Sequence, residues 1–458
     1  MTRWTPAQVA GLAPDDASLA AARRLARPGP WSDTGSTETL VWGKCQGSGR
    51  TPYQVSVDLA GPAFRCSCPS RKFPCKHGLA LLLLWVDGSG SVADVEEAAG
   101  FAQEWAAERA ARGAARGAAR DARAEARAGK APDPDAQARR LEDRLTLMSS
   151  GMDDFSRWLG DLVRSGTATA RRQPQAWWET TAARLVDAQL PGVADDVRSV
   201  GSEVAWRADW SERLLLALGR WWTATRAWAG RDTLEPDELG DLRTYLGWSV
   251  PTDTVRAGDA LPDRWTVLGA HRTDDGRLQQ QRTWLRGATS GETVVVLDFA
   301  AGTQSLPVAR LAGSVLDATV ARYPGRGVRR ALFVDEPAPV ATEGTLPGGT
   351  DVDAAHAWAA RVWAANPWTR RVPVGLAAVR VGVEAAGPTR GARSGTDAPP
   401  PVARAVDPSG AGIRLTTDAD VWALLARTGG HPTDVFGELD HGRFRPLTIV
   451  QRGEAVAL

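Results

Sequence analysis

The sequence predicts an α+β protein of several domains. Its 458 residues exceed the roughly 100 to 200 that one domain usually holds. Apolar residues recur every three or four positions between residues 135 and about 250, as in helices, whereas short strand-like runs dominate after Arg264. Three cysteines and a histidine lie within twelve positions near the N-terminus. We therefore predict a small N-terminal module with a metal-ligand cluster, a mainly helical middle region and an α+β C-terminal domain.

The composition is that of an ordinary globular protein. It is 43% hydrophobic and 24% charged, with a formal net charge of +1, which is unlike a fibre or a disordered tail. The longest apolar stretch, residues 79–86, is far shorter than the ~20 residues of a membrane span, and the first residues lack the apolar core of a secretory signal. We expect a cytoplasmic protein with no membrane partner, and the overall charge points to no particular partner.

The predicted N-terminal module spans residues 1–90 and begins with two helices. Thr5 is placed as an N-cap, Pro6 as the first helical residue, and Gln8 as the residue that completes a capping box. A second helical run covers residues 14–27 and ends at Pro28-Gly29-Pro30.

Two strands and a third helix follow in this module. Residues 39–45 and 53–59 have strand character, and a Gly47-Ser48-Gly49 turn joins them. Residues 79–86 are leucine-rich and form the predicted helix.

Three further regions follow. Residues 91–134 are rich in Ala and Arg and predict a linker helix, which Gly113 and Gly117 weaken. Residues 135–260 predict a helical domain. Its stripe of buried residues comprises Trp206, Trp210, Leu214, Ala217 and Trp221.

The C-terminal α+β domain spans residues 261–458. Strands are predicted at residues 293–299, 330–334, 372–383 and 443–450, and helices at 351–365 and 419–427. Residues 384–412 are rich in Gly, Pro and Ser and predict a flexible loop.

The strongest functional signal is the group Cys66, Cys68, Cys75 and His77. Residues two apart on a strand face the same side, so the first two cysteines can present sulfur to one ion. A six-residue turn then returns the chain, and the second pair lies where that turn enters the leucine-rich helix. Four cysteines in all are too few for a disulfide scaffold, so this clustering favours a metal.

Three thiolates and one imidazole fill the tetrahedral shell of zinc and leave no position for water. Such a closed shell indicates one structural Zn²⁺ rather than catalysis. The alternative is that four unrelated residues happen to be close, with the cysteines buried as small apolar side chains. Cys45 lies outside the ligand spacing and is interpreted as a buried strand thiol.

The motif Cys-x-Cys, six residues, Cys-x-His, after a strand hairpin and before an apolar helix, resembles the SWIM-type zinc finger. The resemblance covers residues 38–86, and the run from Trp42 to Gly49 resembles bacterial members that have uncharacterised C-terminal regions. It implies a small ββα zinc-finger module at about residues 53–88, bound zinc, and binding to DNA or to protein. In some members the finger accompanies a helicase or transposase domain, but nothing beyond residue 90 in this sequence resembles such a domain.

Two hypotheses for the partner remain open. Arg65, Arg71, Lys72 and Lys76 surround the site without a nearby acid in the sequence, which is compatible with nucleic-acid binding through phosphates. The same charges could instead offset the net −1 of three thiolates on a divalent ion. The second hypothesis is a zinc-stabilised adaptor that binds proteins, for example in an ATPase-containing complex, and makes no nucleic-acid contact.

Other features carry less weight. Residues 106–130 hold a run of arginines, which more often forms a solvated helix face than a binding site. The twenty tryptophans are interpreted mainly as core residues because of their helical spacing.

No enzyme motif is apparent. His431, Asp434, Glu438, Asp440 and His441 are close in sequence, but a polar turn and hairpin explain them better than a metal or acid–base site. Neither a phosphate-binding P-loop nor a nucleophile elbow occurs. We expect no enzyme, no catalytic residues, no small-molecule substrate, and no cofactor-binding residues other than the zinc ligands.

Overall fold

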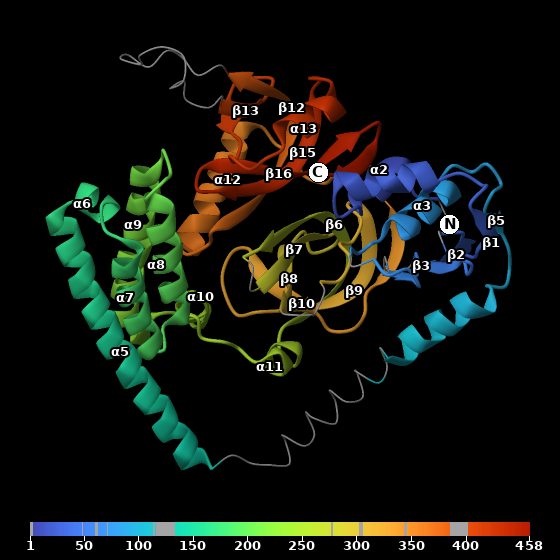
Figure 1. The fold of residues 1–458 in the computed structure, drawn as a ribbon. Helices are drawn as coiled ribbons and strands as arrows, with labels where there is room; N and C mark the ends of the chain where they lie inside the picture. Colours follow the sequence, from blue (N-terminus) through green and yellow to red (C-terminus); the bar gives the residue numbers. More distant parts are fainter. Residues whose placement is uncertain are drawn as a thin grey trace.

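The computed structural model describes residues 3–458 except 48, 60–62, 71, 113–114, 116–132, 276–277, 302–305, 343–345 and 385–401. Figure 1 shows the helical region on one side of the molecule, β-sheets in the middle and the N-terminal module on the other side. The α+β multidomain class predicted from the sequence is confirmed.

The N-terminal module packs helices α1 (Pro6–Gly11), α2 (Asp16–Leu25) and α3 (Lys76–Val86) on one sheet. Strands β1 to β4 of this sheet are antiparallel, and the short strand β5 pairs in parallel with β1 at one edge. The sheet order is β4-β3-β2-β1-β5, with the following bounds: β1 Trp31–Ser36, β2 Leu40–Cys45, β3 Tyr53–Asp58, β4 Ala63–Cys66 and β5 Ala93–Asp94. The expectation of two strands was thus incomplete, because β1 is mostly polar and lacks the alternation that marks a strand in sequence.

Part of the predicted linker is attached to this module. Residues 100–112 are helical, and Ala102 and Trp105 are buried against Leu40 and Trp42 of the sheet. This segment is therefore packed rather than a free spacer. The part of the arginine run from residue 116 onward lies outside the described residues.

The middle region is helical, as predicted. Its helices are α5 Pro134–Ser165, α6 Thr167–Arg171, α7 Gln175–Asp187, α8 Pro191–Val204, α9 Trp210–Ala229, α10 Pro236–Leu246 and α11 Thr252–Arg256. Leu214, Ala217 and Trp221 are fully buried in their shared core. The assignment of Trp206 to that stripe was wrong, because α8 ends before it and its side chain is 72% exposed.

Two six-stranded sheets form the rest of the chain. The first has the order β10-β8-β7-β6-β9-β11, and the second β14-β13-β12-β15-β16-β17. The strand bounds are β6 Ala260–Asp274, β7 Leu278–Gly287, β8 Thr293–Ala301, β9 Ser314–Arg322, β10 Arg329–Phe333, β11 Ala338–Thr342, β12 Arg371–Glu384, β13 Val402–Val406, β14 Gly412–Arg414, β15 Thr433–Asp440, β16 Arg443–Gln451 and β17 Glu454–Ala457.

Helices α12 (Val352–Ala365) and α13 (Val421–Thr428) accompany the second sheet, and both agree with the prediction. The predicted flexible loop 384–412 was wrong in part, because β13 pairs with β12 over residues 402–406. That strand has only five residues, of which Arg404 is the only polar one, so no polar–apolar alternation is evident in sequence. Residues 385–401 of the predicted loop lie outside the described residues.

Buried polar contacts join the parts. Asp196 of α8 is 1% exposed and accepts hydrogen bonds from Trp221 Nε1 (3.0 Å), from the Tyr245 hydroxyl (2.9 Å) and from Arg370, which lies just before β12. The helical region is therefore held to the second sheet by a carboxylate in its own core.

The two sheets share a second buried carboxylate. Glu438 of β15 receives two hydrogen bonds from Arg282 of β7, each 3.0 Å long, and one of 2.8 Å from Trp284 Nε1.

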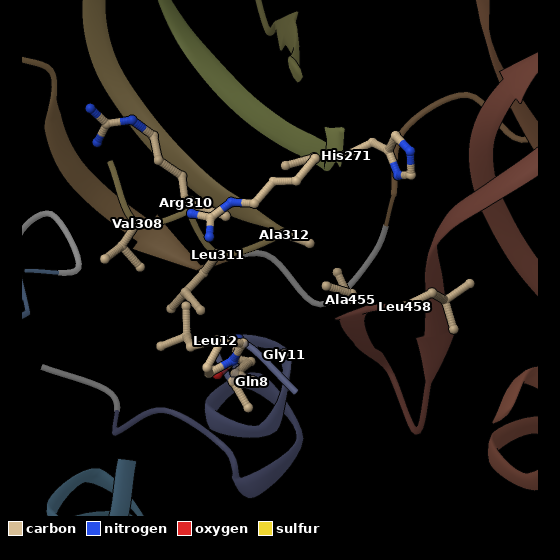
Figure 2. Close-up of a pocket in the computed structure, with 16 residues that line it drawn as sticks. Gln8, Gly11, Leu12, His271, Val308, Arg310, Leu311, Ala312, Ala455 and Leu458 are labelled. Atoms are coloured by element: carbon tan, nitrogen blue, oxygen red, sulfur yellow. The ribbon is translucent and has the colours of Figure 1, made fainter. Parts of the chain in front are cut away.

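The N-terminal module also contacts the sheets. Leu12, after α1, packs with Leu311, which precedes β9, and α1 packs against β17. A hollow of about 220 Å³ remains at this junction, and Figure 2 shows Gln8 and Leu12 on one side of it and Val308 and Leu311 on the other. The module is thus part of the larger body rather than a separate appendage.

None of the described helices is both long enough and apolar enough to cross a membrane.

Candidate metal centre

The first pair of candidate ligands lies at the end of β4. Cys66 is opposite Val55 in the β3–β4 ladder. The pairing continues one residue further, because Ser67 donates its N–H to Gln54 O (3.1 Å) and the Gln54 N–H is donated to Ser67 Oγ (3.0 Å). The extended backbone therefore holds Cys66 and Cys68 on either side of a residue that is fixed to the sheet.

The second pair lies at the start of α3. Cys75 is the N-cap residue, with extended backbone angles, and its carbonyl oxygen accepts the Leu79 N–H at 3.2 Å. His77 follows in the first turn. Gly78 is required next, because a Cβ there would lie 2.7 Å from the ring of Phe64 on β4. This close approach brings the helix start against the strand that carries Cys66.

The ligand atoms of Cys66, Cys68, Cys75 and His77 all lie within 4.8 Å of one another. In a tetrahedral zinc site with Zn–S bonds of ~2.3 Å, neighbouring ligand atoms are roughly 3.8 Å apart. His77 Nδ1 and Cys66 Sγ are already 3.8 Å apart. The donor set and its spacing therefore fit one zinc ion, and the four ligands leave no position for substrate.

The environment favours a thiolate at Cys75. The Cys66 thiol donates a hydrogen bond to it, and with the backbone N–H groups of His77 and Gly78 this lowers the pKa of Cys75 to about 4, against the opposing effect of burial. The same contact with Cys75, together with burial, raises the pKa of Cys66. A divalent ion at the centre would deprotonate both, because its charge outweighs their mutual repulsion.

Two residues beside the site are not identified by the spacing of the ligand motif. The ring of Tyr53 lies 5.0 Å from that of His77 and shields one side of the imidazole. Cys45, at the end of β2, is fully buried, as expected of a structural thiol. The alternation of strand residues could have indicated Tyr53, since β3 was predicted to begin there.

The comparisons with known proteins agree with this geometry. Residues 53–85 match the family model of the SWIM zinc finger. The chain carries a SWIM zinc finger. Residues 143–246, from α5 to α10, match the SWIM-associated four-helix bundle domain, so the SWIM finger and a bundle found with it occur together here. No curated protein and no solved structure matches the chain.

The basic residues around the SWIM finger are less free than the sequence indicated. Arg65 on β4 lies 3.7 Å from Glu108 of the helix at residues 100–112, and Lys72 Nζ lies 2.7 Å from Asp15 at the start of α2. Lys76 is exposed at the first position of α3, and Arg71 lies outside the described residues. Sequence inspection missed these acids because both come from outside the finger.

The polar cluster at residues 431–441 does not assemble into a metal site. Among the described residues, the SWIM ligands form the only group of three or more potential ligands with closely spaced donor atoms. Asp434 accepts a hydrogen bond from the Ala378 N–H, and Glu438 forms the ion pair with Arg282 that joins the two sheets. Asp440 pairs with His441 in the turn between β15 and β16. These residues therefore have structural partners.

Proposed function

We propose that this chain is a zinc-stabilised protein-interaction scaffold with no catalytic site, and that its partner docks on the four-helix bundle. The observation that carries the proposal is where large apolar side chains are exposed. Residues 134–246 are about a quarter of the chain, yet they hold eight of the seventeen such side chains in its described part. The eight are Leu141, Leu147, Val163, Val186, Trp206, Leu215, Leu216 and Trp222. Exposed apolar surface of this kind is typical of protein interfaces.

The exposed surface of the bundle includes a groove between α5 and α7. Its volume is about 230 Å³, and its apolar lining includes Phe155, Trp158 and Leu185, with Leu147 at the edge. The two helices meet closely at Gly151, where a Cβ would lie 2.3 Å from that of Ala188. A groove of bulky apolar side chains between two helices suits the apolar face of an amphipathic helix.

Charged side chains in the lining of the groove indicate which charge a partner would carry. Asp154 and Asp187 line it together with Arg184. Asp154 is already paired with Arg157 on the same helix. We infer a partner helix that places an aromatic or aliphatic side chain in the groove and a basic side chain toward Asp187.

The charges favour a protein over nucleic acid. Phosphate-backbone binding depends on several free Lys and Arg side chains, whereas Arg65 and Lys72 already face carboxylates of this chain. Arg109 and Arg112 of the adjoining helix pair with Asp58 and Glu108. The net charge of +1 supplies no wider field to attract a polyanion.

The SWIM finger then has a structural role in this proposal. Its helix α3 is the centre of the N-terminal core, with Leu79, Leu81 and Leu82 fully buried. Zinc binding is worth ~10 to 16 kcal/mol in small zinc-finger peptides, which is comparable with the stability of a whole domain. The metal would keep this module folded against the sheets.

The test compares the full-length protein with Leu147→Glu and with the matched control Leu278→Glu as affinity baits in the native lysate. Leu147 and Leu278 are 42% and 39% exposed, so neither substitution disturbs a core. We expect a protein that both wild type and Leu278→Glu capture and that Leu147→Glu does not. Capture of nucleic acid instead, lost at high salt and on replacing Lys72 and Lys76 by Gln, would replace this proposal with the nucleic-acid one.

A further inference from the structure

Helix α9 has an apolar face that the described part of the chain leaves uncovered. One side of the helix is in the bundle core, where Leu214 and Trp221 are fully buried. On the opposite side Leu215, Leu216 and Trp222 are 68%, 45% and 50% exposed. Three bulky apolar side chains on one helix face are unusual at a surface that contacts only water.

The same face is symmetric about Gly219. Glu212 lies seven residues before this glycine and Arg226 seven residues after it, so all three fall on one side of the helix. All three are exposed. No heavy atom lies within 4 Å of the position that a Cβ of Gly219 would take. The glycine therefore forms an open notch between Leu215 and Trp222.

We propose that a second copy of this chain covers this face, with two α9 helices packed antiparallel about Gly219. In that arrangement the glycines face each other at the two-fold axis, so the helix backbones can approach closely. Leu216 of each copy meets Trp222 of the other. A two-fold interface requires a surface that complements itself, and this face meets that requirement.

The charges select the antiparallel direction. Two-fold pairing about Gly219 places Glu212 of each copy opposite Arg226 of the other, which gives two opposite-charge pairs at the ends of the contact. A parallel pair would place Glu212 beside Glu212 and Arg226 beside Arg226. Within the described residues neither side chain has an ion-pair partner, and Arg226 lies 6.0 Å from the ring centroid of Trp222 on the same face of the helix.

The contact is small, and this sets the expected strength. Interfaces that bury less than about 1,200 Å² in total are usually weak or transient. We expect a dimer that dissociates in the micromolar range, and sedimentation should cover about 1 to 200 µM of full-length protein, which brackets this affinity. The inference does not depend on the partner in the α5–α7 groove, because that groove is lined by other residues.

The first test uses sedimentation equilibrium of the zinc-loaded full chain. Wild type should pass from monomer to dimer over this range. Gly219→Leu fills the notch and Trp222→Gln removes the side chain that meets Leu216, and each should weaken the dimer at least tenfold. Leucine favours the helix more than glycine does, so Gly219→Leu should keep or raise the melting temperature. Leu141→Gln, at an exposed leucine elsewhere on the bundle, is the matched control and should leave the dimer unchanged.

The second test reverses the charges. Glu212→Arg places arginine opposite arginine twice and should weaken the dimer about fivefold. Adding Arg226→Glu in the same chain restores both pairs and should restore the dimer. A wild type that stays monomeric over the whole range overturns the inference, as does a dimer that Gly219→Leu and Trp222→Gln leave intact. Failure of the double reversal to restore the dimer overturns the antiparallel arrangement.

Discussion

Lys72 Nζ lies 2.7 Å from Asp15 Oδ2, so the turn between the two ligand pairs is fixed to the start of α2. Asp15 also accepts the Ser18 N–H at 2.7 Å as the N-cap of that helix. Lys72, which the sequence indicates as a candidate phosphate contact, is therefore one half of an internal ion pair. Both side chains are accessible, and such pairs add little to stability.

The Asp15–Lys72 pair gives a prediction about nucleic acid. Asp15→Asn keeps an oxygen that can accept the Ser18 N–H and removes the charge that faces Lys72. We expect a zinc content near one per chain, an almost unchanged melting temperature, and no binding of a fluorescein-labelled DNA duplex in anisotropy titrations. Binding that appears in the variant and weakens steeply with salt would instead show that Asp15 masks a phosphate contact.

Loss of one zinc ligand should unfold the N-terminal module. Cys75→Ser removes a ligand and alters the residue that caps α3. We expect zinc, measured by mass spectrometry of the metal, to fall from near one per chain toward zero, and the protease resistance of residues 3–94 to be lost. Cys45→Ala is the control, because Cys45 is buried outside the ligand group. Zinc-free protein that keeps this protease resistance would contradict a structural role for the metal.

Asp196 should be essential for holding the bundle to the second sheet. Asp196→Ala leaves the donors of Trp221, Tyr245 and Arg370 without their shared acceptor. Breaking a buried charge pair in this way costs ~3 to 5 kcal/mol, which urea unfolding can measure. Asp195→Ala is the matched control, since Asp195 pairs with Arg198 at the surface and its loss should cost at most ~1 kcal/mol. Equal effects of the two variants would refute the assignment.

Asp241 should lower stability near neutral pH. It is 8% exposed, and burial raises its pKa to about 6. A carboxyl group whose pKa is raised by folding stabilises the protein below the unfolded pKa of ~3.9, and that contribution is lost as pH rises through the folded value. Asp241→Asn keeps an acceptor for the Arg326 N–H and carries no charge.

We therefore expect Asp241→Asn to stabilise the protein by about 1 to 2 kcal/mol at pH 7.5 and by about half as much at pH 5, midway between the unfolded and folded pKa values. Thermal unfolding of wild type and variant at both pH values checks this. A gain of the same size at both would mean that the charge of Asp241 is not its cause.

The sequence was informative where the chemistry is local. The capping box of Thr5 and Gln8 is present in the structure, because its two hydrogen bonds join residues three apart. The same holds for the ligand group, where strand alternation and the helix start fix four donors within one short segment. The strand and helix that follow from strong apolar patterns, such as residues 293–299 and 351–365, were also predicted correctly.

The contacts that depend on distant segments could not be predicted in this way. Asp15 and Glu108 approach the finger from other elements, so no local pattern indicates that they pair with Lys72 and Arg65. Trp206 had the spacing of a core residue, but the break between α8 and α9 changes the direction of the chain and leaves the ring in solvent. Helical spacing is informative only within one continuous helix.

The packing of α1 against β17 has a consequence for the tendency of the chain to aggregate in the cell. β17 is the last strand of its sheet, and a strand in that position can pair with another chain when its cover is removed. A chain that lost zinc, and with it the fold of its first module, would lose the helix that packs on this strand. Zinc starvation should therefore both unfold the N-terminal module and make the chain prone to aggregate through a sheet that is far from the metal in the sequence.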